Sequence, residues 1–127
     1  MRLVRGIRGS VAMRTELVVR FEYGEVVPWV ARQEDGCLQF TAGPDRLSLH
    51  TAVKLRGQGH RTVGEFLLRA GEELSFTLSY SPSFLLPPAP PDAAKALNYV
   101  EARWTDWAQT FTPMGEWSAV VRRSLLT

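Results

Sequence analysis

Cysteine is almost absent from this chain, because Cys37 is the only one among 127 residues. One cysteine cannot form an internal disulfide, which excludes the disulfide-stapled scaffolds of small secreted proteins and suits a reducing compartment. Histidine is scarce as well, and His50 and His60 have no partner motif at the spacing of metal ligands. We therefore expect structural roles for these residues, and neither a metal nor another cofactor.

Long apolar runs and a strong charge of one sign are also missing. No stretch approaches the roughly 20 apolar residues that span a bilayer, and the early arginines of Met1–Gly6 are not followed by the apolar run of a signal peptide. The net charge is only +2, and the one basic doublet is Arg122-Arg123, so a phosphate-binding surface is excluded. We expect a cytoplasmic protein that binds neither nucleic acid nor membrane.

Catalytic constellations are lacking too. The adjacent acids Glu34-Asp35 and Glu72-Glu73 fall in predicted turns, where solvated charge is common. No serine occupies a G-x-S-x-G elbow, and Cys37 resembles a small apolar residue. We assign no catalytic residue to the chain. Cross-strand ion pairs with arginines are expected for the acids on strand faces, which are Glu16, Glu22 and Glu65.

What the sequence does contain is apolar alternation with a period of two. Its centre is the stretch 13–30, in which residues 16–23 alternate without a break and predict a strand. The apolar face of that strand would carry Leu17, Val19, Phe21 and Tyr23. After Gly24-Glu25, residues 26–30 resume a β-rich run with Pro28 at an edge or bulge.

Further short strands follow the same pattern. We expect strands at 2–8, around Leu38 and Phe40, around Leu47 and Leu49, at 53–55, at 62–69 and at 74–81. Turn signals separate them, at Gly9-Ser10, 34–36, 43–45, 57–59 and 70–72. Short antiparallel strands at this spacing predict a mainly β fold, an antiparallel β-sandwich over residues 1–81.

The pattern changes at residues 82–91, where prolines predict a semi-rigid linker that leaves the sandwich. Asp92 is a suitable N-cap for a helix over 92–112, and a second helix begins at 116–127. The first helix carries an apolar stripe at steps of three and four residues: Leu97, Val100, Trp104, Trp107, Ala108 and Phe111.

The tryptophans of these helices, Trp104, Trp107 and Trp117, allow two interpretations. Tryptophan rings form stacking platforms for sugars. At helical spacing beside apolar residues, however, they are more often the buried face of a packing helix. We favour the packing interpretation and leave open what the helix packs against, because the sandwich already has a core of its own.

Four segments together resemble glycoside hydrolase family 15, in particular its bacterial trehalase and glucoamylase-like branch. They are RLVRGIRGSVAMRTELVVRFEYGEVVPWV, AGPDRLSL, FLLRAGEELSFTLSYSPS and EARWTDWAQT...GEWSAVVRRSLLT, in the family's order. The resemblance implies the second half of a supersandwich-like β-domain, then a linker from Pro87 to Thr112, and the first helix of an (α/α)6 barrel from Trp117. It carries neither catalytic glutamate onto any position here.

The resemblance therefore implies a non-catalytic, scaffolding part of a hydrolase that cleaves trehalose or related α-glucosides with inversion of the anomeric configuration. Its partner would be the barrel domain, contacted through Trp104, Trp107 and Trp117, and the α-glucoside would bind only the full-length protein. Without the barrel, the exposed helices would form a homo-oligomer or limit solubility. The alternative is a stand-alone sandwich that binds a carbohydrate or a protein.

Overall fold

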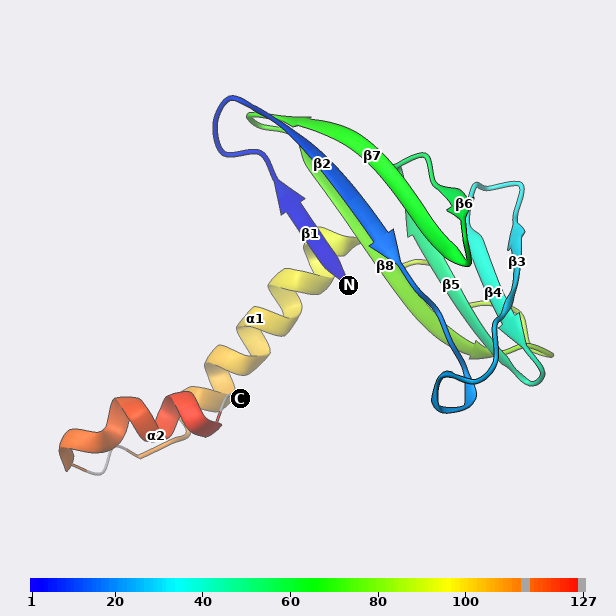
Figure 1. Cartoon of the computed structure of the whole chain (residues 1–127). Coiled ribbons are helices and arrows are strands. Elements are labelled where there is room, and N and C mark those ends of the chain that lie inside the picture. The colour runs from blue at the N-terminus through cyan, green and yellow to red at the C-terminus, as the bar shows by residue number, and fades with distance from the viewer. Residues whose placement is uncertain (113–114, 126–127) are drawn as a thin grey trace. The chain divides into compact units, whose positions relative to one another are not determined.

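The chain forms two antiparallel sheets and, after them in sequence, two helices, as the computed structural model in Figure 1 shows for residues 1–112 and 115–125. The larger sheet has the strand order β1-β8-β5-β4-β3 and the smaller one the order β2-β7-β6. The strands of the larger sheet are β1 (Arg2–Arg5), β8 (Glu73–Pro82), β5 (Asp45–Thr51), β4 (Leu38–Ala42) and β3 (Trp29–Arg32). Those of the smaller sheet are β2 (Ser10–Leu17), β7 (Arg61–Arg69) and β6 (Arg56–Gln58). The mainly β, sandwich-like fold with C-terminal helices is confirmed.

Apolar side chains of the two sheets meet between them and form the core. Phe40 of β4 is only 2% exposed, and the alternation of β4 places Gln39 on the other face of the sheet. The rings of Phe66 in β7 and Phe76 in β8 lie 5.9 Å apart between centroids, so this contact joins the smaller sheet to the larger. The buried cluster consists of Val19, Leu38, Phe40, Leu49, Val53 and Leu55.

The chain crosses from the larger sheet to the smaller at Gly6, which lies against the end of β7. The Gly6 N–H donates to the Glu72 carbonyl at 2.9 Å, and the Gly71 N–H donates to the Gly6 carbonyl at 2.8 Å. A Cβ on Gly6 would lie 2.6 Å from the carbonyl carbon of Arg69 and closer still to its oxygen. Glycine is therefore required here by the close approach of two backbones.

The outer face of the larger sheet is polar but largely buried. The register places Arg46 opposite Ser81 and His50 opposite Thr77, all on this face. Ser81 and Thr77 are 7% and 6% exposed, whereas Leu78, on the inner face of the same strand, is 40% exposed. Along this part of β8 the hydroxyl side chains are thus better shielded from water than the leucine between them.

The proline-rich segment accounts for part of that shielding. The Arg46 guanidinium donates to the carbonyls of Pro82 and Ser83, each at 3.3 Å, and to that of Leu85. The Ser83 N–H donates in turn to the Pro44 carbonyl at 2.7 Å. Figure 1 shows the chain passing behind the sheet after β8. The expectation that this segment leaves the sandwich is wrong for residues 82–85, because buried Arg46 ties them to the sheet.

The strand predicted over residues 16–23 is also corrected, because β2 ends at Leu17. Glu22 and Tyr23 adopt positive φ angles of 48° and 56° in a short 3-10 turn at Glu22–Gly24, which no strand can continue. Phe21 and Val26 close this loop with reciprocal backbone hydrogen bonds of 3.0 and 3.1 Å. Phe21 still packs on the core, while Tyr23 is fully exposed.

Two smaller differences concern strand ends. The first strand stops at Arg5 instead of residue 8, because the chain turns at Gly6 toward the smaller sheet. The strand predicted at 53–55 is irregular chain whose side chains pack into the core, and β6 lies at 56–58 instead. Gly57 is therefore inside a strand, and the tight turn falls at Gly59 and His60, with φ angles of 54° and 61°.

Residues 94–127 form a second compact unit, distinct from residues 1–93. Its helices are α1 (Ala93–Gln109) and α2 (Ser118–Leu125), preceded by a 3-10 turn at Gly115–Trp117. Two of the predicted helix-ending residues, Pro113 and Met114, and the last two residues of the second predicted helix lie outside the described residues. Within the described part of the chain, no helix is long and apolar enough to cross a membrane.

Candidate functional site

A polar cavity of about 550 Å³ opens on the outer face of the larger sheet, within residues 1–93. Strands β5 and β8, the turn after β3 and the chain just before α1 contribute its walls. The lining residues that carry functional groups are Asp35, Cys37, His50, Thr51, Ser75, Thr77 and Asp92. It combines carboxylate, thiol, imidazole and hydroxyl groups, so we consider it first.

Cys37, His50 and Asp35 lie in a row in this cavity. Cys37 Sγ is 3.9 Å from His50 Nδ1, and His50 Nε2 is 3.9 Å from Asp35 Oδ2. The local chain explains the arrangement: Gly36 turns at a φ of 84°, and the Cys37 N–H donates to Asp35 Oδ1 at 2.9 Å. The β4–β5 register then brings His50 alongside Cys37, since Leu38 pairs with Leu49.

The electrostatics of the row do not favour nucleophilic catalysis. Burial, and next the charge of Asp35, raise the pKa of the Cys37 thiol above its ordinary value. A nucleophilic cysteine needs the opposite shift, toward thiolate. The thiol is also only 4% exposed. Among the described residues, no three His, Cys, Asp or Glu side chains are placed to hold a metal ion.

The sequence interpretation treated Cys37, His50 and His60 as isolated residues, and the structure modifies this. It brings Cys37 and His50 together but leaves His60 in the β6–β7 turn, away from this cavity. The grouping with Asp35 was missed. Its one available signal was the Gly43-Pro44 turn, because a two-residue loop there places residue 37 opposite residue 50 across the β4–β5 hairpin.

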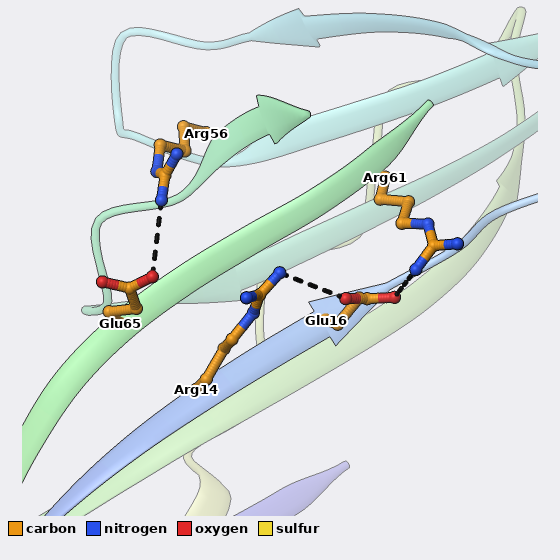
Figure 2. Close-up of polar contacts among 5 residues, drawn as sticks. All are labelled: Arg14, Glu16, Arg56, Arg61 and Glu65. Carbon is orange, nitrogen blue, oxygen red and sulfur yellow. Dashed lines mark hydrogen bonds and ion pairs between the residues drawn. The ribbon is translucent and has the colours of Figure 1, made fainter. Parts of the chain in front are cut away.

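The expected cross-strand ion pairs form on the outer face of the smaller sheet, as Figure 2 shows. Glu16 of β2 pairs with Arg61 of β7 at 2.6 Å and with Arg14 of its own strand at 3.4 Å. Glu65 of β7 pairs with Arg56 of β6 at 3.4 Å. These side chains flank Val63, which is opposite both Glu16 and Arg56 in register and is 1% exposed. We call them the ion-pair ladder: Arg14, Glu16, Arg56, Arg61 and Glu65.

The other acids singled out in the sequence have structural roles or lie elsewhere. Glu72 accepts a hydrogen bond from the Arg69 N–H at 2.8 Å and so closes the β7–β8 turn. Glu73 forms an ion pair with Arg5 across β1 and β8. Glu22 lies in the 3-10 turn and not on a strand face, contrary to the prediction. None of these positions resembles a pair of catalytic carboxylates across a cleft.

The second unit of the chain, which contains the helices, offers a different candidate surface. The side chains of Trp104 and Trp107 lie edge to face with centroids 5.6 Å apart, and with Leu125 of α2 and Arg103 they line a hollow of about 400 Å³. Trp104 and Trp107 are 51% and 43% exposed, and neither α1 nor α2 contains a buried residue. We call this surface the tryptophan patch (Trp104, Trp107 and Leu125). Trp117 is exposed too, but it does not line the hollow.

Comparison with known proteins adds no neighbour to this description. The chain matches no family model, no curated protein and no solved structure.

Proposed function

We propose that the chain is a non-catalytic, scaffolding part of a hydrolase that resembles the trehalases and glucoamylases of glycoside hydrolase family 15. Four sequence segments resemble that family in its order along the chain. A sandwich-like fold followed by helices is the architecture that the resemblance implies. In this proposal, the parent enzyme hydrolyses trehalose or a related α-glucoside with inversion of the anomeric configuration. The general acid and the general base of that reaction lie outside this chain.

The observation that carries the proposal is the exposure of the helices. Helices in folded domains bury their apolar stripe, and more than a third of each tryptophan side chain of the patch faces water here. Large aromatic residues exposed in a group mark a surface that is covered by a partner. The proposed partner is the helical barrel of the parent enzyme, contacted through Trp104, Trp107 and Trp117.

The first test is an immunoblot of the source cells with an antibody against this segment. We expect a band several times heavier than 14.2 kDa, and we expect the longer protein to hydrolyse trehalose or maltose. The purified chain should hydrolyse neither sugar above the rate of a buffer control. A native product of the chain's own size, or hydrolysis by the chain alone, would contradict the proposal.

The polar cavity supports a second candidate, a stand-alone module that binds a carbohydrate. Hydroxyl, imidazole and carboxylate groups line a space of about 550 Å³, within the size range of small-ligand sites. Calorimetric titration with trehalose and with maltooligosaccharides separates the two candidates. Saturable binding that is lost in Thr77→Val, and kept in the matched exposed variant Thr105→Val, would favour the module.

A further inference from the structure

The two sheets have four edge strands, and one of them differs from the rest. β1 has four residues with an arginine at each end, β3 has four residues directly after Pro28, and β6 has three residues. Short length, charge and proline are the usual protections of a sheet edge against further pairing. β2 has eight residues without a proline, and it pairs with β7 along all of them.

An apolar groove follows the other edge of β2. It has a volume of about 410 Å³, and five consecutive residues of the strand, 13–17, line it. Because the strand alternates, Met13 and Leu17 reach the groove from the inner face while Arg14 and Glu16 reach it from the outer face. The groove therefore runs along the backbone edge itself, where the free N–H and C=O groups of β2 lie.

The floor of the groove belongs to the larger sheet. Leu49, Phe76 and Leu78 contribute to it, and Leu78 is 40% exposed although it faces the inside of the sandwich. Met1, together with Arg2 and Val4 of β1, lines the groove as well, so the floor extends from β5 across β8 to β1. A chain that pairs with β2 would lie over this floor and would cover Leu78.

The charges at this edge favour an acidic residue on the added chain. The ion-pair ladder contains three guanidinium groups and two carboxylates (Figure 2). Glu16 already accepts the short 2.6 Å contact of Arg61, so Arg14, with its longer 3.4 Å contact and its side chain 53% exposed, has the weaker partner. A carboxylate opposite Arg14 on an added strand would balance the ladder.

We propose that β2 is an acceptor edge for one extended polypeptide segment, which pairs with it as a fourth strand of the smaller sheet. The segment alternates apolar side chains, which fill the groove, with polar ones on the outer face, where a carboxylate faces Arg14. This interaction surface is independent of the hydrolase proposal, because it involves only residues of the sandwich.

The test uses the full chain and three synthetic nine-residue peptides. The first alternates valine and threonine and has glutamate at its central outward position. The second has lysine at that position, and the third has a proline in place of a central valine. Binding is measured by fluorescence anisotropy, and the pairing site is located by protection of the amides of residues 10–17 from hydrogen exchange.

We expect the glutamate peptide to bind about fivefold more tightly than the lysine peptide, the ratio of a favourable exposed ion pair, and the proline peptide not to bind. Arg14→Glu should reverse the preference between the first two. Leu78→Glu should weaken binding by about tenfold or more, because it places a charge in the groove. The matched control is Leu67→Glu, which changes a leucine on the outer face of β7 and should leave binding unchanged.

Three results would overturn the proposal. The first is absence of binding by a chain whose circular dichroism shows that it is folded. The second is equal loss of binding in Leu78→Glu and Leu67→Glu. The third is concentration-dependent dimerisation that Leu78→Glu abolishes and the peptide does not inhibit, which would assign the edge to a second copy of the chain.

Discussion

Replacing Gly6 with alanine should destabilise the sandwich strongly, although the change adds only one methyl group. The added Cβ would lie 2.6 Å from the Arg69 carbonyl carbon, and this neighbour is backbone that cannot rotate away. Overpacking of a rigid site costs about 1–3 kcal/mol. Separation of the strands would also weaken the hydrogen bonds that link Gly6 to Glu72 and Gly71, each contributing about 0.5–1.5 kcal/mol.

Together these effects predict a loss of about 3 kcal/mol from a total stability of roughly 5–15 kcal/mol. The measurement is urea unfolding followed by circular dichroism. For a small domain with a slope of about 1.5 kcal/mol per molar urea, the midpoint should fall by about 2 M.

Two other glycines provide controls in the same assay. Gly57 has a negative φ in β6 and no heavy atom within 4 Å of an added Cβ, so alanine should be neutral or stabilise by about 0.5 kcal/mol. At Gly64 the Cβ would meet a methyl group of Leu55 at 2.7 Å and one of Val53 at 2.9 Å. Side chains can move, so its cost should be intermediate. Equal midpoints for the Gly6 and Gly57 variants would refute the reasoning.

Three further predictions concern other parts of the chain. Arg46→Leu should lower the free energy of unfolding by about 2–3 kcal/mol and expose residues 83–92 to limited proteolysis, because it removes the donor to several carbonyls. The control Arg8→Leu, at an exposed arginine, should have neither effect. Cys37 should react with a thiol reagent at pH 8 far more slowly in the folded chain than in urea, and stability should decline above pH 9.0. Stability declines with rising pH because burial raises the pKa of the folded thiol above its ordinary 9.0, so the thiol of the unfolded chain loses its proton first. Equal labelling rates in the folded chain and in urea would contradict this. Sedimentation velocity should show self-association of the chain as its concentration rises, and the double substitution Trp104→Ser with Trp107→Ser should reduce this self-association. A monomer at every concentration would contradict a role for the tryptophan patch.

The sequence was sufficient for the strands whose alternation ends at a clear turn signal. β7 and β8 surround Gly71, which has the φ of 83° that the predicted turn requires. The β3–β4 hairpin likewise turns at Gly36. In these places, local conformation and burial favour the same structure, so a period of two is a reliable guide.

The alternation misled where side-chain burial continues without a strand. Val19 and Phe21 contact the core from irregular chain, and Val53 and Leu55 do the same before β6. Apolar spacing reports burial and does not report hydrogen bonding of the backbone, so the ends of β2 and β6 were misplaced. The row of Asp35, Cys37 and His50 depends on the register between two hairpins, which no single segment of the sequence contains.

In β8 the hydroxyl side chains are buried and the leucine is exposed, and this has a practical consequence for anyone who labels or redesigns this protein. Serine is a customary position for attaching a dye or a spin label, because serine side chains are usually exposed to solvent and their substitution rarely disturbs a fold. Here Ser81 is enclosed beside Arg46, and a label on it would push residues 83–85 off the sheet. Tyr80, 60% exposed next to it, leaves more room for a bulky probe, with loss of the 2.7 Å hydrogen bond that its hydroxyl donates to Asp45.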